Sequence, residues 1–471
     1  MLLNMYIPFF GESQLTTGLV IIFAVCMLAV VAFEFVNGFH DTANAVATVI
    51  YTKALKPVIA IPWSGLWNFL GVFTGGIAVA MGILKLVPMD TLMTLPTFVG
   101  ASLVLSVLLA AIIWNLGTWY FGIPCSSSHT LIGALIGAGL GFTWYYGGHG
   151  VDWHKAEEIV LSLIFSPIVG FGLAILLMLF LKHVIRYKAL FHTPKDENDR
   201  PPLLIRAILI TTCTLVSFFH GSNDGQKGVG LFMLVLIAFL PAKFAIDHSI
   251  PNDKIVSTLN QTERILQTIA PDNPKSSAVF TQLTSDMNAV KTHLTFKTEK
   301  NKEGTYKFRK QIEALVESIK ALNANKTLAI DENNRTALNH EATELKKLTE
   351  FAPIWVIITI SLSLGLGTMI GWKRIVVTIG EKIGNEHLNY AQGASSEIVA
   401  ASTIGMSTIL GLPVSTTHVL SGAIAGSMVA LGGKGNLNAG TLKSIGIAWV
   451  LTLPVSILLS LLLFLLFHLF I

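Results

Sequence analysis

The sequence predicts an all-α polytopic membrane protein with two inverted-topology repeats, broken helices, about 10–12 transmembrane segments and a small helical soluble insert. Three observations lead to this prediction: an apolar composition, a pair of duplicated motifs and a charged segment in the second half. The chain has 471 residues, of which 52% are hydrophobic and 13% are charged, and its mean hydropathy is +0.64. This composition is typical of membrane proteins and argues against a soluble enzyme.

Ten apolar runs are long enough to cross a bilayer, whose hydrocarbon core of roughly 30 Å requires about 20 helical residues. They lie near residues 17–39, 58–80, 98–120, 128–146, 158–181, 203–220, 352–371, 391–412, 416–432 and 444–470. No basic segment precedes the first run, which is also longer than the apolar part of a secretion signal. We therefore expect it to remain in the protein as the first span.

A segment in the second half carries an unusual share of the charge. The chain has 32 Lys and Arg residues and 28 Asp and Glu residues, and half of these 60 lie between Pro241 and Glu350. Apolar residues recur there at helical spacing, for example Ile255, Leu259 and Leu266. The pattern predicts a small amphipathic helical bundle in water. The chain shows no basic stripe, so we expect no nucleic-acid partner. Its three cysteines lack metal-ligand spacing, and we expect no bound cofactor.

Two motifs occur twice and define the repeats. "GFHDTANAVAT" pairs with "FHGSNDGQKGVG", which aligns Asp41 with Asp224 at an offset of 183 residues. "CSSSHTLIGALIGAGLG" pairs with "VSTTHVLSGAIAGSMVA", which aligns His129 with His418 at an offset of 289. The offsets differ by 106 residues, about the length of the charged segment. The expected organisation is a first membrane repeat (1–190), a cytoplasmic linker (191–202), a second membrane repeat (203–240 and 351–471) and the soluble insert (241–350).

The distribution of basic residues predicts the orientation. Lys and Arg follow the first and fifth apolar runs, from Lys53 and from Lys182 onward, whereas both chain ends lack them. Because positive charge stays in the cytoplasm, we expect both termini and the insert outside and the linker inside. An odd number of crossings in each half makes the halves antiparallel, which is the inverted-repeat plan of many secondary transporters.

Acidic residues within the apolar runs are the first candidate functional residues. A charged side chain at the bilayer centre costs about 2.5–3.5 kcal/mol, so each one suggests a function. In "HDTANA" and "SNDGQKG" the acid precedes small residues and an amide or amine, which suits a broken helix that binds a cation. Asp41, Asn44 and Asp224 are the cation candidates, with Asp41 and Asp224 as metal ligands, and Glu34 and Glu397 are further coupling candidates. The simpler alternative is a neutral or paired structural acid.

The hydroxyl motifs are candidates for an anion site. A proline precedes each one and stops the previous helix, and Ser or Thr then caps the next. The first N–H groups of a helix have no intrahelical partner, so two such ends brought together would bind a tetrahedral oxyanion. The candidate ligands are Ser126, Ser127, Ser128, His129, Ser415, Thr416, Thr417 and His418. The alternative is ordinary capping with close helix packing behind it, through Gly133 and Gly137 and through Gly422 and Gly426.

Several polar residues next to these motifs are auxiliary candidates: His40, Asn68, His220, Asn223 and Lys227. Histidine titrates near neutral pH, so the four motif histidines could carry protons, or His129 and His418 could cap a helix or donate to the anion. Lys227 could neutralise Asp224 or touch an anion.

At these residues the sequence resembles the Pit family of inorganic phosphate transporters. The resemblance rests on "NGFHDTANAVATVIYTKA", "IIWNLGTWYFGIPCSSSHTLIGA", "FHGSNDGQKG", "TMIGWKRIVVTIGEKIG" and "GLPVSTTHVLSGAIAG". It implies uptake of inorganic phosphate coupled to a cation, which is Na⁺ in some branches and H⁺ with a divalent metal phosphate in the bacterial one. It places the chain in a bacterial inner membrane, with the lipid bilayer, phosphate and cations as partners. Among protein partners, a homodimer stays open.

The sequence departs from the sodium-coupled members at two positions. Asn68 stands where those have an acid, although the later acid remains as Glu397, and Lys227 stands where an amide ligand is expected. These departures favour symport of phosphate with H⁺, carried through Glu34 or a histidine and helped by Mg²⁺ or Ca²⁺. Na⁺ symport is the alternative.

Two other classes of protein, a hydrolase and a channel, are alternative interpretations of the sequence. A Ser and a His could form an intramembrane serine hydrolase, but a nucleophile and base adjacent in sequence and duplicated with Thr fit hydroxyl donation better. We therefore expect no enzyme. An anion channel could also have inverted repeats, and accumulation against a gradient would distinguish a symporter from a pore.

Overall fold

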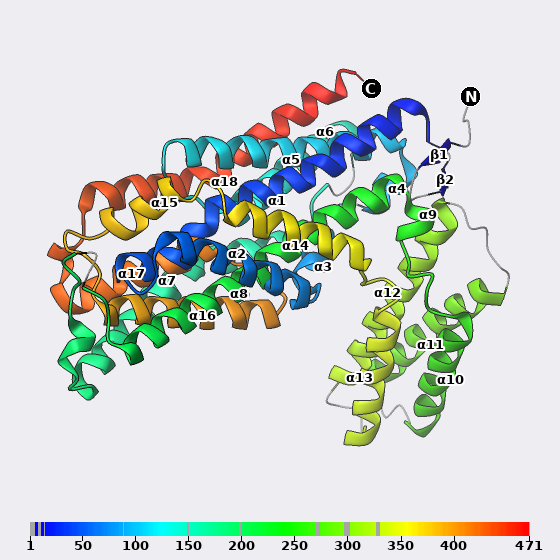
Figure 1. Cartoon of the computed structure of the whole chain (residues 1–471). Helices are drawn as coiled ribbons and strands as arrows, with labels where there is room; N and C mark the ends of the chain where they lie inside the picture. The colour runs from blue at the N-terminus through cyan, green and yellow to red at the C-terminus, as the bar shows by residue number, and fades with distance from the viewer. Residues whose placement is uncertain are drawn as a thin grey trace.

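The structure is a computed structural model that describes residues 5–7, 11–13, 15–87, 89–147, 150–196, 199–269, 274–295, 302–325 and 330–470. A short antiparallel ribbon, β1 (Met5–Ile7) with β2 (Gly11–Ser13), precedes the helices. The first half contains α1 (Thr17–Tyr51), α2 (Pro57–Thr74), α3 (Ala78–Leu84), α4 (Met89–Thr94), α5 (Thr97–Tyr120), α6 (Ser127–Tyr146) and α7 (Trp153–Val184). Figure 1 shows these helices packed side by side in one elongated bundle.

The helices of the second half lie on either side of the insert in the sequence. After η1 (Lys188–Phe191) it contains α8 (Leu203–Phe239), α9 (Pro241–Phe244), α14 (Ile354–Thr368), α15 (Lys373–Val377), a π-helical turn η2 (Thr378–Lys382), α16 (Tyr390–Ile409), α17 (Thr416–Gly432), η3 (Lys434–Asn436) and α18 (Ala439–His468). The insert contains α10 (Asn252–Thr268), α11 (Pro274–Thr295), α12 (Lys302–Ala324) and α13 (Glu332–Lys346).

The helix lengths confirm a polytopic membrane protein. Among the described residues, six helices are long and apolar enough to cross a membrane, namely α1, α2, α5, α7, α8 and α18. The segment from α14 through η2 makes a seventh if its 56° bend is counted within one span. Each of the ten predicted apolar runs contains a helix, and α6, α16 and α17 occupy the remaining three with shorter or more polar sequences.

The two aspartate motifs do not break their helices, so the interpretation of "HDTANA" and "SNDGQKG" as helix breaks is wrong. α1 runs unbroken through Asp41 and α8 runs unbroken through Asp224. Freed backbone groups would need new partners in a buried, water-poor interior, whereas an intact helix keeps them bonded. The bend lies instead between α14 and α15, where Gly371 has a φ of +74°, a left-handed conformation that glycine adopts readily.

Helices of one half pack mainly against helices of the other. α6 lies against α18 and α17 lies against α7, while α1 pairs with α14 and α8 pairs with α2. Glycines allow the close approach: an added Cβ at Gly137 would lie 2.1 Å from the Ile457 carbonyl oxygen, and one at Gly426 would lie 2.3 Å from the Phe171 carbonyl oxygen. The packing glycines of the two hydroxyl motifs therefore face equivalent helices, each across the boundary between the halves.

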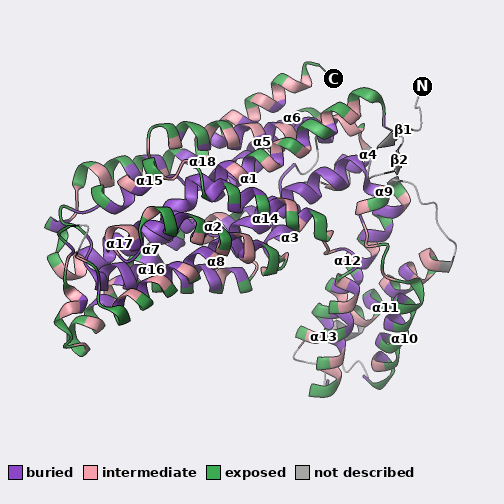
Figure 2. Ribbon diagram, viewed as in Figure 1, coloured by how far each residue is buried: buried purple, intermediate pink, exposed green. Residues whose placement is uncertain are grey.

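The insert is helical, as predicted, and has an apolar cluster of its own. Ile255, Leu259 and Leu266 are buried there with residues from the other three insert helices. Its two ends meet, because the Asp247 N–H donates to the Leu348 carbonyl oxygen at 2.8 Å. Figure 2 shows a buried interior in the insert separate from that of the main bundle. In Figure 1 the insert and both chain termini lie toward one end of the bundle, and the linker around η1 lies at the other.

Candidate functional site

The centre of the bundle holds two buried carboxylates with a histidine between them. Asp41 on α1 and Asp224 on α8 are at most 1% exposed. The Nε2 atom of His220, one helical turn before Asp224, lies 3.6 Å from Asp41 Oδ2 and 3.7 Å from Asp224 Oδ2. One ligand atom from each of these residues lies within 4.8 Å of the others, a spacing that fits a metal ion. The structure thus brings the two predicted aspartates together and adds His220.

The hydrogen bonds of His220 determine what it presents to the carboxylates. Its Nδ1 lies 2.8 Å from Asn68 Oδ1, while Asn68 Nδ2 donates to Thr368 Oγ1 at 3.0 Å. Because the Asn68 oxygen can only accept, His220 Nδ1 carries the proton in this pair. A neutral ring then presents a lone pair at Nε2. His220 Nε2 and Asp224 Oδ2 have no hydrogen-bond partner among the described residues, so with a neutral ring three acceptors would converge on one point.

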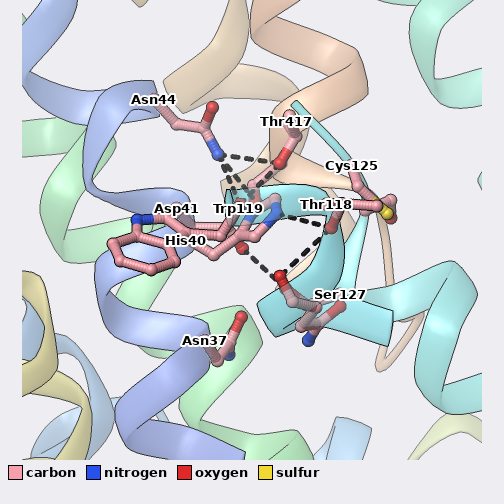
Figure 3. A network of polar contacts seen from close by, with 12 residues as sticks. Asn37, His40, Asp41, Asn44, Thr118, Trp119, Cys125, Ser127 and Thr417 are labelled. Atoms are coloured by element: carbon pink, nitrogen blue, oxygen red, sulfur yellow. Dashed lines mark hydrogen bonds and ion pairs between the residues drawn. The ribbon is translucent and has the colours of Figure 1, made fainter. Parts of the chain in front are cut away.

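Asp41 links the first repeat to both hydroxyl motifs (Figure 3). Its Oδ1 accepts from Thr417 Oγ1 at 2.5 Å and from Asn44 Nδ2 at 3.0 Å. Its Oδ2 accepts from Ser127 Oγ at 3.4 Å. Asn44 Nδ2 also donates to Thr417 Oγ1 at 3.0 Å and to Thr416 Oγ1 at 3.5 Å. One carboxylate therefore touches hydroxyls from the beginnings of α6 and α17.

Asp224 has a different partner. Its Oδ1 accepts from Lys227 Nζ at 2.6 Å, and the same ammonium donates to Ser128 Oγ and, at 3.3 Å, to the Val414 carbonyl oxygen. Ser128 Oγ donates to that carbonyl as well, at 2.7 Å. Lys227 is 1% exposed, so its charge is compensated by protein oxygens and not by water.

The two hydroxyl motifs cap the helices that they begin. Ser126 and Ser415 are the N-cap residues of α6 and α17, and each hydroxyl accepts from the backbone N–H of the motif histidine at 3.2 Å. The capping alternative thus describes these two serines. The hydroxyls of the next two residues in each motif face the aspartate centre instead, as the Asp41, Asn44 and Lys227 contacts show.

The motif histidines occupy two different places. His129 and His418 lie with ring centroids 4.5 Å apart, and His129 Nδ1 lies 2.9 Å from Ser126 Oγ. His418 also lies 4.1 Å from the Trp449 ring. His40 sits behind Asp41, with Nδ1 at 3.8 Å from Asp41 Oδ1 and Nε2 at 3.2 Å from Thr118 Oγ1.

The remaining predicted residues lie at the edge of the centre or away from it. Asn223 donates to Thr408 Oγ1 and accepts from the Val414 N–H, so it holds the segment before α17 in place. Glu397 accepts from the hydroxyls of Thr48 and Thr212 and makes no contact with either aspartate.

Glu34 accepts a 3.4 Å hydrogen bond from Asn37 and packs against Gly228. Neither this acid nor Glu397 belongs to the aspartate cluster.

Thr48, Thr212 and the Val414 carbonyl are contacts that we did not predict. Of these, only Thr48 could have been found from the sequence. It follows Asp41 by seven residues, which places both on one face of α1.

The chain is similar to known proteins over most of its length. A model described as the phosphate transporter family matches residues 37–460. The chain belongs to this family. Among its relatives, the chain is 40% identical to the low-affinity inorganic phosphate transporter of Buchnera aphidicola subsp. Acyrthosiphon pisum and 40% identical to PitA of Escherichia coli K12. Each comparison covers 96% of this chain and 97% of the relative. The resemblance to the Pit family is thus confirmed, and transport replaces the hydrolase alternative.

A solved structure supports the fold of this family member. The chain matches "The sodium-dependent phosphate transporter" with a TM-score of 0.61, at 20% sequence identity, covering 96% of this chain and all of that one. This similarity establishes a shared helical architecture for the two proteins.

Proposed function

We propose that the protein imports inorganic phosphate together with a divalent metal ion, by symport with H⁺. The observation that carries the proposal is the convergence of Asp41 Oδ2, Asp224 Oδ2 and His220 Nε2 beside the beginnings of α6 and α17. With a neutral His220 ring, these three acceptors have no donor between them, and a cation at this point would satisfy all three. The adjacent helix ends supply donors for an anion.

The phosphate binds at the two helix N-termini. The free N–H groups and positive dipole ends of α6 and α17 favour an oxyanion, and the hydroxyls of Ser127, Ser128, Thr416 and Thr417 surround the same region. Ser126, Ser415, His129 and His418 support these helix ends as caps and ring contacts. Helices from both halves thus contribute donors to one anion.

The metal ion is carried as part of the substrate, and the residues present fit it. Two carboxylates and an imidazole offer it three ligand atoms, and phosphate oxygens complete its coordination. Carboxylate and phosphate oxygens are the ligands that Mg²⁺ and Ca²⁺ prefer. Because Asp41 already contacts Ser127 and Thr417, a metal on its carboxylate would lie next to the bound phosphate.

The charge of the centre favours coupling to one monovalent cation, for which we propose H⁺. With both aspartates ionised and Lys227 protonated, the site has a net charge of −1, and a neutral metal phosphate leaves this charge unchanged. One added proton makes the occupied site neutral, which lowers the cost of burying it. Glu34 and the motif histidines are the groups that could carry this proton. Na⁺ in the same role is the alternative.

The packing of helices across the two halves also supports an inverted arrangement of the repeats. With basic residues in the linker and near α15, the positive-inside rule places the linker in the cytoplasm and both termini in the periplasm. The insert lies at the end of the bundle that carries the termini, and so on the periplasmic side of a bacterial inner membrane (Figure 1).

Uptake of radiolabelled phosphate into proteoliposomes tests the proposal when pH, Na⁺ and Mg²⁺ gradients are imposed one at a time. We expect accumulation above equilibrium when the interior is alkaline and Mg²⁺ or Ca²⁺ is present outside. A strict requirement for a Na⁺ gradient would contradict H⁺ coupling and leave phosphate transport intact. Equilibration without accumulation under every gradient would indicate a channel.

A further inference from the structure

The two repeats make one equivalent set of contacts with two different side chains. Asn44 follows Asp41 by three residues, and Lys227 follows Asp224 by three. Asn44 Nδ2 donates to Asp41 Oδ1 and to Thr417 Oγ1. Lys227 Nζ donates to Asp224 Oδ1 and to Ser128 Oγ, and Ser128 is the repeat equivalent of Thr417 at the offset of 289 residues.

The oxygens around Lys227 form the ligand set of a hard cation. The ammonium contacts a carboxylate of Asp224, the hydroxyl of Ser128 and the carbonyl of Val414, all from buried residues. Hard metal cations bind carboxylate, hydroxyl and carbonyl oxygens in proteins. The lysine side chain therefore occupies a position that a free cation could fill.

The equivalent position in the first repeat holds an amide in place of the ammonium. Asn44 is neutral, and its Oδ1 is buried without a hydrogen-bond partner among the described residues. Rotation of this amide would turn an oxygen toward a cation held by Asp41 and Thr417. The two positions thus differ in charge. The second contains its own cation, the Lys227 ammonium, whereas the first would take a cation from solution.

We propose that Lys227 is a tethered cation that permanently fills the second of two equivalent cation positions. This assignment rests on the proposed function: because Lys227 fills the second position, only the first could take a free cation beside the metal phosphate. Lys227 leaves Asp224 Oδ2 free for the metal and takes only Oδ1. Removing the ammonium is expected to create a site for a small free cation at Asp224.

Thermal unfolding of the purified, detergent-solubilised protein tests this assignment. K227A removes the ammonium and leaves a space lined with oxygens, so its melting temperature should fall below that of the wild type in choline chloride. NaCl or methylammonium chloride at the same ionic strength should raise the melting temperature of K227A by about 2–4 °C or more, because a ligand that binds only the folded state stabilises it. The wild type, whose second position Lys227 already fills, should gain less from NaCl or methylammonium chloride than K227A does.

Two matched variants separate the tethered cation from other roles. K227M fills the same space with an apolar chain and should melt low in every salt. D224N/K227A lacks the carboxylate and should gain no more from Na⁺ than the wild type does. If K227A does not fold, K227N supplies the same test with an amide that can ligate a cation, and it should gain Na⁺ dependence in phosphate uptake.

The assignment is overturned if Na⁺ raises the melting temperatures of K227A and K227N by no more than that of the wild type. It is also overturned if their only defect is weaker phosphate binding at every cation concentration, which would make Lys227 a phosphate ligand. The unfolding assay does not depend on transport. A wild type that fails to take up phosphate would therefore refute the proposed function while the cation rescue could still succeed.

Discussion

Thr417 on α17 donates a 2.5 Å hydrogen bond to Asp41 on α1, joining residues that lie 376 positions apart. The hydroxyl belongs to a helix end suited to an anion, and the carboxylate belongs to a centre suited to a cation. A phosphate that recruits the Thr417 hydroxyl must compete with the carboxylate for its proton. A metal on Asp41, as proposed above, would relieve that competition, so each ligand would favour binding of the other.

Removing the charge of either aspartate should abolish coupled uptake. Asp41→Asn and Asp224→Asn keep the size and hydrogen-bonding capacity of the side chain but supply no negative charge for a cation. Phosphate uptake in proteoliposomes measures the loss, and the yield of detergent-solubilised protein controls for insertion. Uptake at the wild-type rate in either variant would assign that aspartate a structural role.

Removing one hydroxyl should weaken phosphate binding moderately. Ser128→Ala and Thr417→Ala should each cost about 1–2 kcal/mol, roughly a five- to thirtyfold loss of affinity, because the backbone donors remain. The double variant should lose more than either single one. Calorimetry in detergent measures these affinities. If both single variants bind phosphate normally and only melt earlier, the phosphate binds elsewhere.

The insert should be dispensable for some transport. The Asp247–Leu348 hydrogen bond brings its two ends together, so a short linker in place of roughly residues 250–345 would not strain the bundle. We expect phosphate uptake by the shortened protein to remain measurable. Complete loss from a protein that still inserts and unfolds cooperatively would show that the insert takes part in transport.

The glycine contacts between α7 and α17 should tolerate no side chain. Gly426→Ala would place a methyl group 2.3 Å from the Phe171 carbonyl oxygen, and overpacking of this kind costs about 1–3 kcal/mol. Gly172→Ala on the neighbouring helix is the control, because its added methyl group meets no atom within 4 Å. Thermal unfolding in detergent should separate the two variants. Equal melting temperatures would mean that the helices shift apart without penalty.

The sequence predicted the helices and the candidate residues more completely than their contacts. Hydropathy located all ten apolar runs, and the repeat pointed to Asp41 and Asp224 as a pair. The sequence could not show that Asp41 contacts Thr417 or that His220 lies between the aspartates, because these contacts depend on how the helices pack.

The expected helix breaks failed for a related physical reason. Asn44 and Lys227 bond to their own aspartates three residues earlier, which satisfies these polar groups without unwinding the backbone. Composition alone does not distinguish a polar side chain that interrupts a helix from one that bonds to another side chain of the same intact helix.

The pairing of α6 with α18 also constrains biosynthesis. Ser127 leaves the ribosome long before Ala439, an interval of roughly 15–60 s at about 5–20 residues per second. Throughout that interval α6 must wait in the membrane or its translocon with its glycine face uncovered. Nascent chains that stall before α18 would expose this face to membrane proteases. Synthesis of α18 would therefore decide whether the chain is protected from degradation.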